Sequence, residues 1–298
     1  MKLVKGALMI ALLTLVISPK AFAATSPALG AADPFSILAG TYTNTAPGTT
    51  LNGDLGYTTG PAVAPTVSGT THSADSVYNQ AGIDQGTALS NLNGQACSFS
   101  FAPGAINLAT DTTHGPVGVY TPGVYCITGA ASVGSGGTIT LNGAGTYIFR
   151  MDGALTTSAN SIVTTSNGAS ACNVWWTPTA ATTLGATSTF LGTDIDASGI
   201  TIGSTVTWTG RALAFGGTVS TSVDTINTVP ACSAATTTSG SSGTNTGTGT
   251  TSTTPGLPNT GNAAPQKNML WTAAPIALSV IAVVAVIYWI RVKNSKNA

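Results

Sequence analysis

The chain contains very little charge. Only 6% of its 298 residues are acidic or basic, whereas about a quarter is usual in globular proteins. Between Ala24 and Thr260 there are nine aspartates, no glutamate and only two basic residues, Arg150 and Arg211. Because a nucleic-acid-binding protein needs a basic surface, this composition excludes nucleic acid as a partner.

Catalytic groups are also scarce. The sequence has two histidines, no GxSxG elbow and no phosphate-binding loop. A hydrolase or lyase would need paired carboxylates, or a metal with a basic residue. Asp194 and Asp196 could share a strand face and bind calcium, although their position favours a strand that ends near a turn. The other candidates are His72, His114, Asp224, and Asp152 beside Arg150. We expect no enzyme, no cofactor and no metal site.

Both ends of the chain have the features of targeting segments. Residues 1–23 read as a signal peptide, with Lys2 and Lys5 before a short apolar stretch and the small-residue sequence AFA at its end. The apolar stretch, Gly6 to Ile17, is too short to span a membrane comfortably. We therefore expect an exported protein whose mature chain begins near Ala24.

The C-terminal region resembles a sortase cell-wall sorting signal. Its pentapeptide is formed by Leu257, Pro258, Asn259, Thr260 and Gly261. An apolar run at 270–290 is long enough to cross a bilayer, and a basic tail follows at 291–298. The resemblance implies cleavage between Thr260 and Gly261 and attachment to cell-wall peptidoglycan. The alternative is a plain membrane anchor, and either arrangement leaves the domain outside the cell.

The exported part is expected to comprise a domain at 24–232 and a stalk. Residues 233–256 are almost entirely Ser, Thr and Gly, a composition that cannot bury a core. The domain has four cysteines, Cys97, Cys126, Cys172 and Cys232, without a zinc-type CxxC spacing. Three disulfide pairings are possible. We favour Cys97–Cys126, which ties a helix end to the next rung, together with Cys172–Cys232.

A repeat of about 18 residues indicates a β-solenoid. An aliphatic residue follows a small or hydroxyl residue, and a second bulky apolar residue follows six or seven positions later. The inward-facing positions are predicted to be Leu155, Leu184, Ile202 and Val219, closed by Ile162, Phe190, Trp208 and Ile226. A β-sandwich would also contain many short strands, but it would not require the same spacing in successive coils.

One segment has helical rather than strand periodicity. Residues 73–93 place Val77, Tyr78, Ala81, Ala88, Leu89 and Leu92 on roughly one face. Ser73 is predicted to cap the start, and Asn93-Gly94 is a stop signal. Gly82 and Gly86 weaken the helix, which therefore needs packing along the solenoid.

Motifs from FSILAGTYTNT through PGVYCI and ACNVWW to TGRALAFGGTVS resemble those of the microbial ice-binding domain family, DUF3494. The likeness extends over about Ala31 to Asn227. It implies a right-handed β-helix of triangular cross-section with one long helix alongside. It also implies that one flat face, with ladders of Thr, Ser and Ala, binds the surface of an ice crystal.

Alternation along the strands predicts three outward ladders. The first contains Ala154, Thr183, Thr201 and Thr218. The second contains Thr156, Gly185, Gly203 and Ser220, and its glycines interrupt it. The third, nearer a corner, contains Ser161, Thr189, Thr207 and Thr225. The sequence ranks the Thr201 ladder first as an ice-binding surface. The competing function is a wall-anchored adhesin that binds a glycan or another cell, for which exposed aromatic side chains would be needed.

Overall fold

The computed structural model describes residues 23–229. Almost all of the predicted signal peptide, Cys232, the stalk, the LPNTG motif, the apolar run at 270–290 and the basic tail lie outside these residues. Within 23–229, no helix combines the length and the apolar character needed to cross a bilayer.

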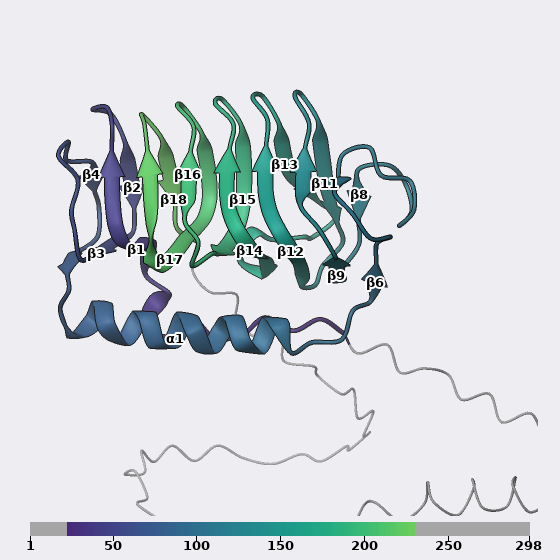
Figure 1. Cartoon of the computed structure of the whole chain (residues 1–298), viewed down its shortest axis with the longest axis horizontal. Helices are drawn as coiled ribbons and strands as arrows, with labels where there is room; N and C mark the ends of the chain where they lie inside the picture. Colours follow the sequence, from purple (N-terminus) through teal and green to yellow (C-terminus); the bar gives the residue numbers. More distant parts are fainter. Residues whose placement is uncertain (1–22, 230–298) are drawn as a thin grey trace, which may run out of the picture. The chain divides into compact units, whose positions relative to one another are not determined.

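The domain is a stack of parallel strands with one long α-helix along its side (Figure 1). Eighteen strands hydrogen-bond into one continuous sheet, and each named strand pair is parallel. Short strands rich in Thr, Val and Ile suit such a stack because β-branched side chains pack well on a pleated surface. The predicted all-β, solenoid-like fold with one accompanying helix is confirmed.

Each coil contributes strands to three rows. The helix row, which α1 covers, contains β3 (Asp54–Tyr57), β5 (Thr71–Ser73), β6 (Phe99–Ser100), β9 (Gly123–Ile127) and parts of the longer strands. The Thr201 row contains β7 (Ile106–Asn107), β10 (Ala131–Val133), β16 (Ile200–Ile202) and the last residues of β1 (Phe35–Asn44), β12 (Tyr147–Thr157), β14 (Val174–Leu184) and β17 (Thr207–Thr221). The Thr207 row contains β2 (Thr50–Asn52), β4 (Thr66–Val67), β8 (Val119–Tyr120), β11 (Thr138–Asn142), β13 (Ile162–Ser166), β18 (Thr225–Asn227) and the first residues of β15 (Thr189–Ile195) and β17.

The order of the coils in space differs from their order in the chain. Strand β1 lies against β17, near the end of the domain, and the next strands extend the stack away from it to β5. Helix α1 then returns the chain along the whole stack to β6 at the opposite end (Figure 1). From β6 the coils build back towards β1, so β1 and β17, which are far apart in the chain, are neighbours in the stack.

Two apolar layers hold the fold together. Inside the coils, rings from successive rungs contact one another, with centroid distances of 5.1 Å for Tyr125–Phe149 and 4.4 Å for Phe149–Trp176. A second layer lies between α1 and the helix row, where Tyr78 and Leu92 pack among residues such as Trp175 and Leu213. Burial of apolar surface in these two layers is the main favourable contribution to the folding of the domain.

Helix α1 (Ser76–Asn93) begins three residues later than predicted. Its N-cap is Asp75, not Ser73, and the Asp75 carboxylate accepts a 2.8 Å hydrogen bond from the Tyr78 amide. Ser73 belongs to β5, and Ala74 takes a φ of 51° to turn the chain between strand and helix. Val77 was wrongly placed on the packed face, since it is 41% exposed.

The predicted Cys97–Cys126 disulfide is present, with a Cα–Cα distance of 5.8 Å. It joins the chain just after α1 to β9, as the sequence suggested. The second predicted pairing includes Cys232, which lies outside the described residues.

Candidate functional site

The predicted ladders fall on two different rows of strands. Thr156, Thr183, Thr201 and Ser220 lie in the Thr201 row, whereas Thr189, Thr207 and Thr225 lie in the Thr207 row. The third predicted ladder is therefore not the edge of the first surface but part of a separate one. Two surfaces, rather than one, compete for the same role.

In the Thr201 row, the register regroups the predicted residues. Thr201 pairs with Thr183 on one side and with Ser220 on the other, and Thr156 pairs with Thr183. Thr218 pairs instead with Thr41. The observed ladder is Asn107, Ser132, Thr156, Thr183, Thr201, Ser220 and Thr43. Gly185 and Gly203 lie outside it, so the predicted interruption was wrong.

A shift of two residues explains the mistaken grouping. Val219 aligns with Ile200, not with Ile202, although all three side chains are buried. Because side chains alternate with a period of two, a shift of two residues keeps every inward residue inward. An apolar pattern alone therefore cannot distinguish the two registers.

The Thr207 row contains the ladder that is richer in threonine. Its seven paired positions are Thr138, Ile162, Thr189, Thr207, Thr225, Thr50 and Thr66. At about 4.7–4.9 Å between strands, these positions extend over roughly 29 Å. Thr50 and Thr66 were missed because they precede α1 in the chain and join the stack only through the insertion of β1 beside β17.

Ser161 was wrongly assigned to this ladder. Its side chain is buried, and Ile162, predicted to face inward, is 41% exposed and occupies the ladder position instead. Val163 fills the core in place of Ile162, eight residues after Leu155, whereas Phe190 follows Leu184 by six. The corners of the coils thus differ in length, and a fixed spacing between inward residues cannot follow them.

The two rows differ in regularity. The register in the Thr201 row shifts on both sides of Ala154 and again between Ala39 and Thr41. The Thr43 hydroxyl donates a 2.7 Å hydrogen bond to Ser220, so two hydroxyl groups of that ladder are partly engaged with each other. Pairing along the Thr207 ladder proceeds from Thr189 to Thr66 without a register shift. Regular spacing is therefore better kept on the Thr207 row.

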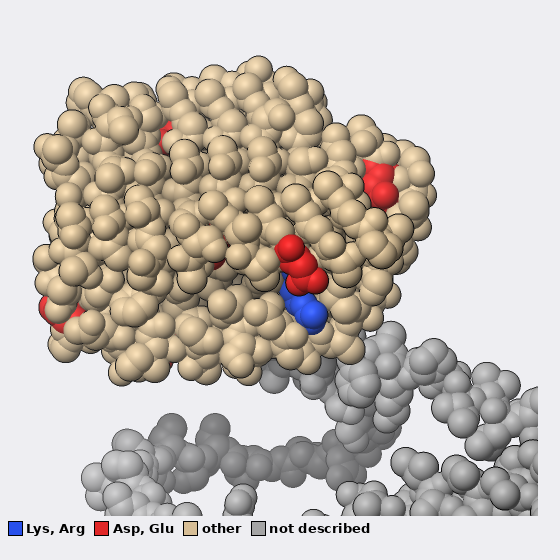
Figure 2. All heavy atoms as spheres, viewed as in Figure 1, with Lys and Arg blue, Asp and Glu red and all other residues tan. Residues whose placement is uncertain are grey.

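The ladders carry no charged residue, and charge is sparse on the domain surface. Figure 2 shows only scattered acidic and basic side chains over the visible face. Three aspartates, Asp194, Asp196 and Asp224, are almost fully buried. The two ladders therefore present hydroxyl, amide and apolar groups.

The two carboxylates considered for calcium, Asp194 and Asp196, are both almost fully buried. Asp194 faces the interior, where desolvation raises its pKa well above the usual range. Asp196 sits at a corner and accepts hydrogen bonds of 2.8 Å from the Thr182 and Ser198 amides. Within residues 23–229, no group of three or more His, Cys, Asp or Glu side chains is arranged to hold a metal ion.

The other candidate groups serve structural contacts. Arg150 donates a 2.6 Å hydrogen bond to the Gln95 carbonyl, while Asp152 is exposed. Asp224 accepts hydrogen bonds from the Val206 and Ser222 amides. A shallow depression near the end of α1 is lined by Ala23, Thr25, Gly94, Gln95, Ala96 and Val124, none of which titrates. These surroundings offer no nucleophile with an adjacent base.

Comparison with known proteins agrees with this geometry. The model of the ice-binding-like family matches residues 37–227. The chain belongs to this family. An ice-binding protein of Nostoc sp. (strain HG1) is 34% identical over 228 residues, which cover 72% of this chain and 77% of the relative. An ice-binding protein of Flavobacterium frigoris (strain PS1) is 29% identical over 197 residues, covering 62% and 71%.

Solved structures share the fold. The crystal structure of an ice-binding protein from the Antarctic ascomycete Antarctomyces psychrotrophicus superposes with a TM-score of 0.61 at 28% identity. It covers 68% of this chain and 98% of the ascomycete protein. These family members are described as ice-binding proteins and not as enzymes.

Proposed function

We propose that the protein adsorbs to ice through the outward face of the Thr207 row. The observation that supports this most directly is the ladder of six threonines and one isoleucine on seven successive strands. The family membership and the names of its relatives support ice as the ligand.

Threonine suits this role for physical reasons. Its side chain is stiff about χ1, so neighbouring hydroxyl and methyl groups repeat with the spacing of the strands. Such an array can hold water in a nearly ice-like pattern before it meets a crystal. Charged groups would bind water strongly in other orientations, and the ladder has none.

The core directly beneath the ladder supports a flat, rigid surface. Phe190, Trp208 and Ile226 alternate with the ladder threonines and are at most 1% exposed. The Trp208 indole donates a 2.8 Å hydrogen bond to the Gly192 carbonyl of the preceding coil. Close-packed protein interiors resist deformation, so we expect the threonines above this core to keep their spacing.

A matched pair of substitutions tests which row binds ice. Thr207 and Thr201 are both exposed, and each lies within its ladder. A tyrosine at either position would stand out from a flat surface and hold water apart from the protein. We expect Thr207→Tyr to lose most freezing hysteresis and Thr201→Tyr to keep most of it. Both variants should differ from the native protein in stability by less than about 0.5 kcal/mol.

The opposite outcome would move the binding surface to the Thr201 row, which the sequence ranks first. If both variants keep full hysteresis, neither ladder contacts ice. If the unaltered protein neither shapes crystals nor delays freezing, the proposed function itself is wrong.

The competing adhesin function has less support from side-chain positions. Sugar binding by stacking needs exposed aromatic rings, yet Trp175, Trp176 and Trp208 are at most 2% exposed. A glycan array with the purified protein would test this alternative.

We also propose that the protein is exported and held at the cell surface. Residues 1–23 supply the export signal, and Leu257 to Gly261 with 270–290 supply the sortase signal and membrane segment. Thr260→Ala should then move the protein from the wall fraction to the membrane fraction.

We also propose that the coil is right-handed and triangular in cross-section, as the family resemblance implies. A crystal structure would test both features.

A further inference from the structure

The chain has two histidines, and they lie in coils at opposite ends of the stack. His72 belongs to β5, in the last coil reached before α1. His114 lies in the loop that closes the other end, between β7 and β8. Each histidine is paired with an aspartate three positions away in sequence, and both imidazoles are nearly buried.

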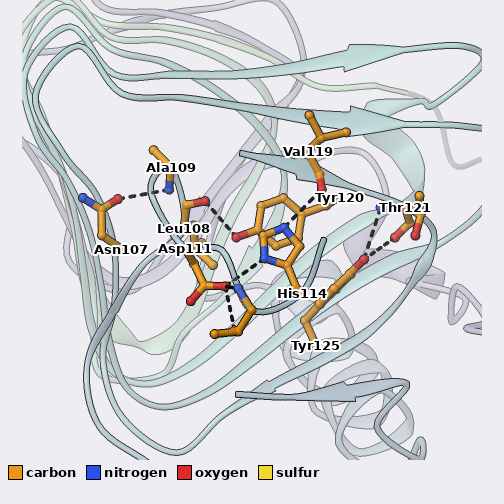
Figure 3. A network of polar contacts seen from close by, with 10 residues as sticks. Asn107, Leu108, Ala109, Asp111, His114, Val119, Tyr120, Thr121 and Tyr125 are labelled. Carbon is orange, nitrogen blue, oxygen red and sulfur yellow. Dashed lines mark hydrogen bonds and ion pairs between the residues drawn. The ribbon is translucent and has the colours of Figure 1, made fainter. Parts of the chain in front are cut away.

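The ring of His114 is surrounded by acceptors. Its Nδ1 lies 2.9 Å from the Asp111 carboxylate, and its Nε2 lies 3.1 Å from the Val119 carbonyl (Figure 3). A neutral imidazole has one donor and one acceptor nitrogen, whereas neither partner here can donate when Asp111 is ionised. Only the imidazolium form satisfies both contacts.

An aromatic ring lies directly against the His114 imidazole. The ring stacks on Tyr120 with centroids 4.0 Å apart and an angle of 6° between the planes. A cation over an aromatic face is attracted by the ring quadrupole. Tyr120 and Tyr125 donate their hydroxyl protons to the Leu108 and Thr121 carbonyls, so neither competes for the imidazole (Figure 3).

Asp111 is held as a carboxylate by its other contacts. Burial raises its pKa, but hydrogen bonds from His114 and from the Thr113 amide and hydroxyl outweigh this and lower it overall. Asp111 is the charged residue that faces His114 among the described residues. The loop is thereby fastened from Asp111 through His114 to Val119 of β8.

His72 makes an equivalent contact at the other end. Its Nδ1 lies 2.7 Å from the Asp75 carboxylate and its Nε2 lies 3.6 Å from that of Asp54. The Tyr78 amide, followed by His72, lowers the pKa of Asp75. Asp54 also accepts a 2.7 Å hydrogen bond from the Thr70 amide, and the Phe35 ring lies 5.3 Å from the imidazole. The His72 imidazole lies between two carboxylates and so connects β3, β5 and the start of α1.

We propose that His72 and His114 are proton-dependent clasps, one at each end of the stack, and that each end opens when its histidine loses its proton. Loss of the proton leaves one imidazole nitrogen facing an oxygen without a hydrogen and removes the attraction to the carboxylates. The consequence is local, because each clasp fastens its own end.

Opening would also shorten the proposed ice-binding ladder. His114 fastens Val119 of β8, which pairs with Thr140 in the strand that contains Thr138. His72 fastens the coil that contains Thr66. This consequence rests on the proposed function, whereas the clasps themselves do not.

The test compares protonation with local opening in the full chain. Imidazole nitrogen NMR follows the two histidines separately, and amide hydrogen exchange is measured for residues 58–75 and 101–118. After correction for the intrinsic pH dependence of exchange, we expect exchange of 101–118 to accelerate at least about tenfold as His114 loses its proton. Exchange of 58–75 should follow His72 in the same way. Flat profiles through both titrations would overturn the proposal.

His114→Gln supplies a matched comparison. Gln is neutral at every pH and lacks the two opposed donors, so exchange of 101–118 should be fast and independent of pH. Residues 58–75 should keep the native profile, and His72→Gln should give the reverse pattern. A variant in which both ends respond together would contradict two separate clasps. If either variant fails to fold, the titration of the native chain still decides the question, and none of these readouts depends on ice.

Discussion

The guanidinium of Arg211 donates a 2.6 Å hydrogen bond to the carboxylate of Asp33, a residue 178 positions earlier in the chain. Arg211 also donates to the backbone carbonyls of Asp33 and Val229. These contacts join the N-terminal end of the domain, at Asp33, to its C-terminal end, at Val229. They lie beside the place where β1 pairs with β17. One of the two basic side chains of the domain therefore fastens both of its ends.

Arg211→Ala should destabilise the domain strongly. The Arg211 side chain is nearly buried, and breaking a buried ion pair typically costs about 3–5 kcal/mol. Because the Asp33 side chain is about a third exposed, we expect a loss near the lower end, about 3 kcal/mol. Chemical denaturation measures it. Asp33→Asn keeps an acceptor for the guanidinium and should cost less; an equal or greater loss would mean that Asp33, not Arg211, holds the closure.

The two glycines of α1 should respond in opposite directions to alanine. At Gly82 a Cβ would lie 2.4 Å from the Phe215 ring, whereas at Gly86 it would meet nothing within 4 Å. Gly86→Ala should stabilise the protein by about 0.5–1 kcal/mol through helix propensity. Gly82→Ala should lower the melting temperature because the Phe215 ring, which packs against Tyr78, must shift. A gain at both positions would contradict the close approach of α1 to Phe215.

Relief of backbone strain should stabilise the corner between the Thr201 and Thr207 rows. Successive coils place Asn160, Thr187, Thr205 and Val223 there, with φ of 59°, 59°, 61° and 61°. The left-handed region costs an L-residue roughly 1–2 kcal/mol, and Asn tolerates it best after Gly. Val223 is 40% exposed, so Val223→Asn removes little packing. We expect a gain of up to about 1 kcal/mol in unfolding free energy. A loss would indicate that the Val223 side chain packs more than its exposure suggests.

Asp224 should make the domain less stable as pH rises. Desolvation raises its pKa from 3.8 to about 6, against the effect of two backbone hydrogen bonds. The folded state therefore binds this proton more tightly than the unfolded state. Stability from this group is greatest below about pH 4 and falls as pH rises through about 6, by on the order of 3 kcal/mol. Asp224→Asn should flatten this part of the stability profile measured by urea unfolding; an unchanged slope would assign the dependence to another group.

Much of the fold was predictable because most inward positions of the coils are apolar. Leu184, Ile202 and Trp208 face the core as expected. The register between coils was not, because Val219 can align with Ile200 or Ile202 without turning any apolar side chain outward. The number of residues in each corner could not be predicted from the sequence either. As a result, Ile162 was predicted to face inward, whereas Val163 occupies the core and Ile162 is exposed.

The insertion of β1 beside β17 had a larger effect on the candidate site. It adds Thr50 and Thr66 to the ladder from a part of the chain more than 100 residues before Thr189. Local repeats cannot reveal a partner at that distance. The full length of the Thr207 ladder is therefore visible only in the three-dimensional pairing. This is why the sequence ranks the Thr201 row first as the ice-binding surface, whereas we propose the Thr207 row.

Ile162 is the one ladder position in the Thr207 row without a hydroxyl, and restoring a threonine there should increase ice activity. Ile162 pairs with Thr138 on one side and Thr189 on the other. Ile162→Thr would make all seven positions threonine and extend the continuous hydroxyl array to β11. Since Ile162 is 41% exposed and Val163 fills the core below it, the change in stability should stay within about 0.5 kcal/mol. We expect more freezing hysteresis than in the native protein at equal concentration. Ile162→Ala shortens the exposed side chain without adding a hydroxyl and should not give this gain. If Ile162→Thr and Ile162→Ala behave alike while Thr207→Tyr abolishes hysteresis, the contact with ice ends at Thr189 and does not reach β13.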